Sequence, residues 1–393
     1  MSHTLQQIFS SLVVGSLLAT HVSSWPVNSY VNWHNFHATG VNLGGWLVQE
    51  PNIDPYWWGV HGGTPDMDEW TWCKNLGDQC GPVLEERYAT YITTDFIDKL
   101  ASVGTTIIRV PTTYAAWVQV PGSELYTGKQ TSYLKQVATH AIEKYGMHVM
   151  IDLHSLPGGT NFLTIGEATG HIGWYNSSEN LAYSLQAVHK VIDFIQSSGH
   201  PNHYTLEPIN EPMDNIAALF TPNALTPSGR AWVKQYFDLV IEHVAAVNPK
   251  IPVALQTFLT EEDWSPQFDA SANIVFDQHI YYFENDTVGS ANLSSAICAD
   301  AQRYSGDGKF PVFIGEWAIQ TGVDNVLALR EHNLQNAQYA WNKYAHGSAM
   351  WTGRHFGNVS VDGEGLQGDY WSYEKFIDLG YVKPVEELEC SCS

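Results

Sequence analysis

Residues 310–317 read Phe-Pro-Val-Phe-Ile-Gly-Glu-Trp, a short apolar run that ends in a glutamate, Glu316. Runs of this length and composition are typical of a buried strand. Residues 205–212, Thr-Leu-Glu-Pro-Ile-Asn-Glu-Pro, repeat the pattern and end near a second glutamate, Glu211. Strands of a parallel barrel open their carboxyl ends on one face, so both carboxylates could meet there.

The rest of the chain supplies the other strands of such a barrel. The strand-like segments are residues 40–48, 106–111, 148–154, 205–211, 251–257, 274–281, 310–316 and 349–352. Helix-like segments with apolar residues at helical spacing are residues 91–101, 134–142, 181–196, 228–247, 291–304 and 332–346. Apolar strands that alternate with helices predict a parallel sheet covered on both faces. Eight such units favour an α/β fold of the (β/α)8 TIM barrel type over an open doubly wound sheet.

Two stretches rich in Gly, Pro, Asp and Trp, residues 49–88 and 155–180, follow predicted strands. Long loops after barrel strands hang over the carboxyl face and shape a substrate cleft there. The composition does not divide the chain, so we expect one catalytic domain over residues 25–393.

The amino terminus predicts secretion. An apolar stretch from Ile8 to Leu18 precedes small residues and a candidate cleavage site at Ser24, so residues 1–24 are interpreted as a secretory signal peptide. Asn-X-Ser/Thr sequons, which are glycosylated only on the secretory route, stand at Asn176, Asn285, Asn292 and Asn358. Away from the leader no apolar run approaches the ~20 residues of a membrane span. We therefore expect an extracellular, monomeric protein, with the cell wall as a candidate location.

The five cysteines fit an oxidising compartment. Cys73 and Cys80 are close enough in sequence to close a small loop. Cys298 could pair with either Cys390 or Cys392, and one cysteine must remain odd.

The formal charge of −23 excludes several classes of partner. An acidic surface repels nucleic acid and anionic membranes, whereas a neutral polysaccharide is compatible with it. The chain lacks the H-E-x-x-H motif of zinc sites and the G-x-S-x-G motif of serine esterases. A pair of carboxyl groups suffices for glycoside hydrolysis, so we expect no metal and no organic cofactor.

Seven sequence pieces, in order along the chain, resemble glycoside hydrolase family 5, and within it the fungal exo-β-1,3-glucanase branch. They are Gly40–Pro51 (GVNLGGWLVQEP), Ile107–Pro111 (IIRVP), Ile151–Gly159 (IDLHSLPGG), Pro208–Pro212 (PINEP), Asp277–Tyr281 (DQHIY), Phe313–Ala318 (FIGEWA) and Ala349–Thr352 (AMWT). The resemblance implies a secreted retaining β-glycosidase that acts on β-glucan.

The resemblance also implies residue roles. Glu211 would be the general acid/base and Glu316 the nucleophile, with Arg109 and Tyr281 in contact with the nucleophile. Asn210 would hold the sugar 2-hydroxyl. A nucleophile of this kind needs a lowered pKa and its partner a raised one, and retention requires the carboxyl groups about 5–5.5 Å apart.

The remaining implied contacts concern the sugar. His154 and His279 would line the bound sugar and the acid/base, Trp351 would provide a stacking floor, and Glu50 would hydrogen-bond the innermost sugar. Asn161 would contact the terminal sugar. Each of these residues also has a purely structural interpretation in a barrel core.

Two positions depart from the exo-glucanase pattern: Asn161 lacks its acidic partner, and Gly353 stands where the branch has a second tryptophan. Both departures are expected at the outer subsites. Phe162 and Phe283 are the candidates for an aromatic clamp at the entrance, and Glu207 is expected to be a buried structural carboxylate. Open alternatives are an endo-β-1,4-glucanase or mannanase of the same fold and a catalytically silent glycan-binding protein.

Overall fold

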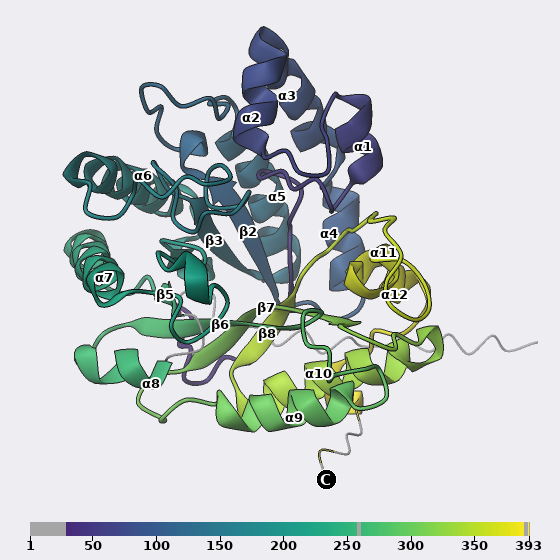
Figure 1. Ribbon diagram of the computed structural model, residues 1–393. Coiled ribbons are helices and arrows are strands. Elements are labelled where there is room, and N and C mark those ends of the chain that lie inside the picture. Colours follow the sequence, from purple (N-terminus) through teal and green to yellow (C-terminus); the bar gives the residue numbers. More distant parts are fainter. Residues whose placement is uncertain (1–28, 258–260, 389–391, 393) are drawn as a thin grey trace, which may run out of the picture.

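The computed structural model describes residues 29–257, 261–388 and 392, and the predicted leader lies outside these ranges. Eight parallel strands form a closed barrel in sequence order (Figure 1). They are β1 Ala38–Asn42, β2 Ile107–Thr113, β3 His148–Ser155, β4 Tyr204–Glu207, β5 Val253–Gln256, β6 Ile274–Tyr282, β7 Val312–Thr321 and β8 Gly347–Met350. The barrel closes where β1 pairs with β8, with Gly40 opposite Ala349. The predicted (β/α)8 barrel is confirmed.

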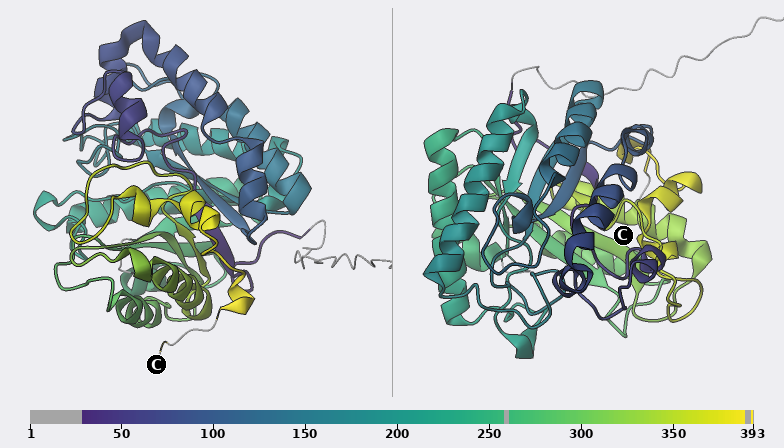
Figure 2. Two further views of the ribbon diagram at one scale, coloured as in Figure 1. Left: turned by 90° about the vertical axis from the view of Figure 1, so that its right-hand side faces the viewer. Right: turned by 90° about the horizontal axis from the view of Figure 1, so that it is seen from above.

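Helices surround the strands on the outside of the barrel (Figure 2). They are α1 Pro55–Val60, α2 Glu69–Leu76, α3 Cys80–Thr90, α4 Thr94–Ala101, α5 Gln130–Tyr145, α6 Ser178–Ser197, α7 Pro227–Val247, α8 Glu261–Trp264, α9 Leu293–Arg303, α10 Arg330–Tyr344, α11 Gly368–Trp371 and α12 Tyr373–Asp378. Local sequence sets many of their ends. The Thr93 hydroxyl accepts from the Phe96 amide to start α4, and Gly146, with φ 67°, ends α5.

The expectation of a continuous loop over residues 49–88 was wrong, because this stretch contains α1, α2 and most of α3. These helices stand together at one end of the molecule (Figure 1). Their apolar contacts come from tryptophans: the rings of Trp58 and Trp72 stack at 4.7 Å. By contrast, residues 156–177 form neither helix nor strand, as expected.

Two predicted strands are shorter than expected. β1 ends at Asn42 and β4 at Glu207, so Pro208 follows its strand and interrupts no ladder. A proline lacks the amide hydrogen that a central strand needs, which explains why β4 stops there.

Disulfides join two pairs of cysteines among the described residues. Cys73 pairs with Cys80, as expected, and Cys298 pairs with Cys392. The second bridge ties α9 to the carboxyl terminus and decides between the two partners that the sequence left open.

One end of the barrel interior is filled by a compact apolar cluster. Residues of β1, β2, β3, β5, β6, β7 and β8 contribute to it, together with Val31, Trp33 and Phe36 from the segment before β1. The ring centroids of Trp33 and Phe313 lie 5.1 Å apart, and the Trp33 indole donates to the Thr205 hydroxyl. This packing seals the end of the barrel opposite the carboxyl ends of the strands.

We expect Phe313→Ala to lower the free energy of unfolding by about 3–5 kcal/mol, because it opens a cavity among residues from seven strands. The control is Val247→Ala at the end of α7, where the side chain is 54% exposed. Denaturant unfolding measures both. Equal, small losses for the two variants would contradict this view of the barrel interior.

Candidate active site

A cavity of about 590 Å³ opens among the loops that follow the barrel strands. Its lining includes residues that follow β1, β3, β4, β6, β7 and β8 or stand near their ends. Among them are Glu50, His154, Glu211, His279, Tyr281, Glu316 and Trp351. Seven of the ten residues predicted from sequence therefore line one cavity.

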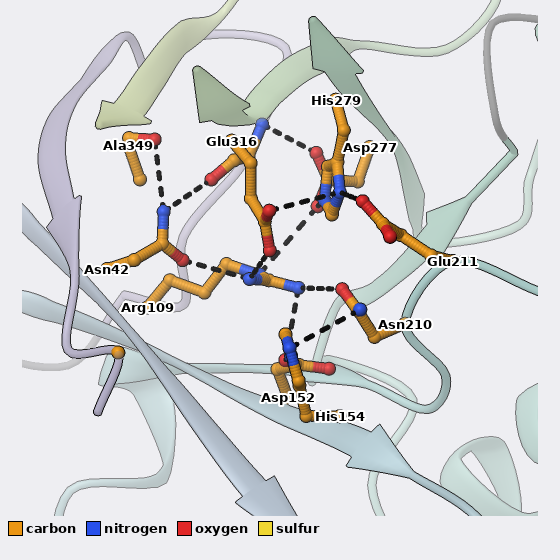
Figure 3. Close-up of polar contacts among 12 residues, drawn as sticks. Asn42, Arg109, Asp152, His154, Asn210, Glu211, Asp277, His279, Glu316 and Ala349 are labelled. Carbon is orange, nitrogen blue, oxygen red and sulfur yellow. Dashed lines mark hydrogen bonds and ion pairs between the residues drawn. The ribbon is translucent and has the colours of Figure 1, made fainter. Parts of the chain in front are cut away.

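Donors contact both carboxylate oxygens of Glu316, and Figure 3 shows the contact with Arg109. The Arg109 guanidinium donates to Oε1 at 2.7 Å, and the Tyr281 hydroxyl donates to Oε2 at 2.8 Å. Burial raises the pKa of the Glu316 carboxyl above its ordinary value, although the charges of His279 and Arg109 act to lower it. The expected lowered pKa was wrong in direction, because the effect of burial outweighs that of the nearby cations.

Glu211 follows β4 on a strained piece of backbone. Its φ is 44°, in the left-handed region that non-glycine residues rarely adopt. The conformation brings its Oε1 to 2.8 Å from Nδ1 of His279. One carboxylate oxygen of Glu211, one ring nitrogen of His279 and one carboxylate oxygen of Glu316 all lie within 4.8 Å of one another. Carboxyl groups this close match the separation of about 5–5.5 Å that suits direct attack by one of them, and not the roughly 6.5–9.5 Å that accommodates an attacking water.

Arg109 is the cation at the centre of the site. It is fully buried, and its three nitrogens contact acids from β3, β4 and β7. Nε lies 2.6 Å from Glu207, and Nη2 lies 3.0 Å from Asp152. Nη2 also donates to Oδ1 of Asn210. The prediction that Glu207 is a buried carboxylate partner of the barrel is consistent with this placement.

A second group of side chains lies beside the carboxyl pair. Nδ1 of His154 lies 2.6 Å from Asp152, and the His154 ring stacks on Trp351 with centroids 5.5 Å apart. Burial raises the pKa of Glu50 to about 7, with the charges of Glu316 and Glu211 adding to the effect. Glu50 is therefore a third carboxyl group of the cavity.

The structure corrects the positions of two predicted outer-subsite residues. Asn161 is fully buried, its Oδ1 accepts from the Leu163 amide, and it is absent from the described cavity lining. Gly353 packs against Phe96 and the Asn42 carbonyl, where a Cβ would already be tight at 3.1 Å. Neither residue faces the cavity, since each serves to fold its own loop.

The aromatic residues at the entrance were only partly anticipated. Phe283 lines the cavity, whereas Phe162 does not; Phe220, which is 43% exposed, does. Trp371 also lines it and stacks on Tyr281 at 5.3 Å. Trp371 comes from α11, beyond the last strand, so no strand-end pattern marks it in the sequence.

We expect Arg109→Met to lower the free energy of unfolding by about 3–5 kcal/mol, because three buried carboxyl groups would lose their cation. Arg230→Met is the matched control, since the Arg230 pair with Asp263 is largely solvated and is worth at most about 1 kcal/mol. Chemical denaturation compares them. A cost for Arg109→Met no larger than that of the control would contradict the assigned network.

Two curated relatives are 30–35% identical to this chain over the aligned residues. A probable glucan 1,3-beta-glucosidase A of Aspergillus clavatus is 30% identical over 73% of this chain, and the chain spans 66% of the length of that relative. Glucan 1,3-beta-glucosidase 1 of Schizosaccharomyces pombe is 35% identical over 74% of this chain and 70% of the relative.

Two solved structures are more similar. The crystal structure of AoRut is 56% identical, with a TM-score of 0.89 over 90% of this chain and 99% of that one. A rutinosidase from Aspergillus niger is 53% identical, with a TM-score of 0.88 over 90% and 100%. The family model for cellulase (glycosyl hydrolase family 5) matches residues 77–356. With this match over most of its length and a carboxyl pair in its barrel, the chain belongs to glycoside hydrolase family 5.

Proposed function

We propose that this glycoside hydrolase is a retaining β-glycosidase with Glu316 as nucleophile and Glu211 as general acid/base. The observation that carries the proposal is the spacing of the two carboxyl groups. One carboxylate oxygen of Glu211 lies within 4.8 Å of one carboxylate oxygen of Glu316. Retaining enzymes place their carboxyl groups about 5–5.5 Å apart, whereas inverting enzymes need more room for a water.

In the first step, a Glu316 oxygen attacks the anomeric carbon while Glu211 gives its proton to the departing glycosidic oxygen. Arg109 and Tyr281 hold the attacking carboxylate by its two oxygens, which favours the ionised form and fixes its direction. The products of this step are the free alcohol and a glycosyl ester of Glu316.

In the second step, Glu211, now ionised, takes a proton from water as that water attacks the same carbon. The ester bond breaks, Glu316 leaves as a carboxylate, and Glu211 is protonated again. His279, 2.8 Å from the Glu211 carboxyl, orients it in both steps. The Oδ1 atom of Asn210 accepts from Arg109, and its Nδ2 atom lies 3.5 Å from Nε2 of His154. The second N–H of Nδ2 is the proposed donor to the sugar 2-hydroxyl.

For the substrate, we propose a β-glucoside of the rutinoside type, in which the glucose carries rhamnose on its 6-hydroxyl, in place of the β-1,3-glucan expected from sequence. An identity of 53% to a rutinosidase over 90% of the chain outweighs 30% to glucan 1,3-beta-glucosidases. A cavity of about 590 Å³ is of a size typical for small ligands. An exo-acting β-1,3-glucanase remains the second candidate, because the curated relatives carry that name.

We further propose that the protein is a secreted glycoprotein that acts as a monomer. Its sequon residues Asn176, Asn285, Asn292 and Asn358 are all exposed, and its disulfides suit an oxidising compartment. In the described part of the chain, no helix is long and apolar enough to cross a membrane.

A substrate panel tests the specificity. Rutin, an aryl β-glucoside, laminarin, β-1,6-glucan, cellulose and mannan are compared by kcat/KM and product size. We expect rutin to exceed laminarin at least about tenfold, a difference of about 1.4 kcal/mol in the barrier, with rutinose released intact. A preference for laminarin with glucose as product would favour the exo-glucanase instead.

The variant Glu316→Gln keeps the shape of the side chain and removes the attacking charge. We expect turnover of every hydrolysed substrate to fall by about a thousandfold or more, while folding and sugar binding persist. Glu69→Gln, another buried carboxyl outside the cavity lining, is the control and retains activity. Activity of Glu316→Gln within tenfold of the parent would eliminate Glu316 as the nucleophile.

A further inference from the structure

A second pair of carboxyl groups lies among the residues that hold the catalytic pair. Glu207 ends β4 and Asp277 stands in β6, and neither side chain is exposed. One carboxylate oxygen of Glu207, one carboxylate oxygen of Asp277 and one ring nitrogen of His279 all lie within 4.8 Å of one another. Oε1 of Glu207 and Oδ2 of Asp277 are both buried, and neither makes a hydrogen bond to the described residues. Oδ2 of Asp277 has longer ion-pair contacts, at 3.4 Å to Nε2 of His279 and 3.9 Å to Nε of Arg109.

Two ionised carboxylates this close and this far from water repel each other strongly, and each would leave an oxygen unsatisfied. A single proton between them removes the repulsion and satisfies both oxygens. We propose that Glu207 and Asp277 share one proton, held mainly on Glu207, and that this pair positions His279 against Glu211.

The surroundings decide which carboxyl keeps the proton. Burial raises the pKa of Glu207 well above its ordinary value, even beside Arg109. Burial also acts to raise the pKa of Asp277, but the charges of His279 and Arg109 outweigh it and lower that pKa. The Gly315 amide donates to Oδ1 of Asp277 at 2.6 Å, which further stabilises the ionised form.

Residue 315 must be glycine for this contact to exist. A Cβ at Gly315 would lie 2.1 Å from Oδ2 of Asp277. The glycine directly precedes Glu316, so the Asp277 carboxylate contacts the backbone that carries the nucleophile. The pair therefore contacts, through Asp277, the strand that carries the catalytic carboxyl group.

A continuous series of contacts runs from the nucleophile through the pair to the acid/base. Arg109 links Glu316 to Glu207, at 2.7 and 2.6 Å. Asp277 lies 3.4 Å from Nε2 of His279, whose Nδ1 is 2.8 Å from Glu211.

With a proton on Glu207, that carboxyl group carries no charge, and the remaining charged groups form two balanced sets. Arg109 is left to balance Glu316 and Asp152, and Asp277 is left to balance His279. Asp277 and Glu316 raise the pKa of His279 well above its ordinary value despite burial, so that His279 donates to Glu211 as a cation. The other charged group that faces the pair is Asp152 on β3, whose negative charge adds to the rise in the pKa of Glu207.

The test uses Glu207→Gln in the full-length protein, because a glutamine imitates the neutral acid: it donates to Asp277 and accepts from Arg109. We expect the difference infrared spectrum at pH 7 to lose one protonated carboxyl band, and the pH profile of kcat/KM to move by less than about half a unit. If Glu207 is ionised instead, no band disappears, and loss of its charge moves the acid limb to lower pH by about a unit or more. That result would overturn the proposal.

Asp277→Asn is the second variant, and it tests the pair even if Glu207→Gln fails to fold. His279 loses a negative neighbour, so its pKa falls and the alkaline limb of kcat/KM moves to lower pH. We expect kcat to fall at least about tenfold, with KM changing less. An alkaline limb that stays in place would refute the positioning role.

Glu69→Gln is the matched control for both measurements. Burial raises the pKa of Glu69 to about 8, so this variant also loses a protonated carboxyl band at pH 7, but its pH profile should not move. The activity measurements rest on the proposed function, whereas the infrared measurement does not. If Glu207→Gln loses the band while Glu316→Gln stays active, the catalytic assignment of Glu316 fails and the proton assignment of Glu207 stands. The two proposals can therefore fail separately.

Discussion

The ion pairs of Arg109 are the constraint on which the site depends. A guanidinium without access to water must be surrounded by acids, and each of its nitrogens has one or more polar partners. Those partners stand on β1, β3, β4 and β7 or directly after β4. Only a closed parallel barrel brings so many strand ends to one cation, so the fold and the site specify each other.

The same burial governs the protonation of the site. It raises the pKa of Glu316, Glu50 and Glu207, and it is opposed wherever a cation lies alongside. Sugar hydroxyls carry no charge, so a neutral substrate does not disturb this balance, whereas the carboxyl groups can exchange protons within it. A site of this kind suits proton transfer to and from an uncharged glycoside.

Much of the fold and of the candidate site could be predicted from the sequence, because the ends of the barrel strands can be recognised from their short apolar runs. Glu211, Glu316 and Tyr281 each follow or end a short apolar run, and parallel strands bring such positions to one face. The resemblance to family 5, rather than the strand pattern, placed Arg109 and His279 in the site. What periodicity cannot predict is the environment of a side chain, which explains why the direction of the Glu316 pKa was wrong.

Other features were beyond sequence reasoning for physical reasons. Residues 49–88 are rich in turn formers, yet α1, α2 and α3 are stabilised there by tryptophan packing and a disulfide. The orientation of Asn161 depends on hydrogen bonds within its own loop, and Trp371 reaches the cavity from a helix after the barrel is complete. Long-range packing of this kind has no local period.

Double displacement across one glycosidic bond is the central claim, and the configuration of the first product tests it most directly. Proton NMR of a β-glucoside digest, recorded before the released sugar mutarotates, distinguishes the two anomers. Attack by Glu316 followed by water predicts that the β-anomer of the released sugar forms first. Initial formation of the α-anomer would contradict a covalent intermediate on Glu316 and require a water between the two carboxyl groups.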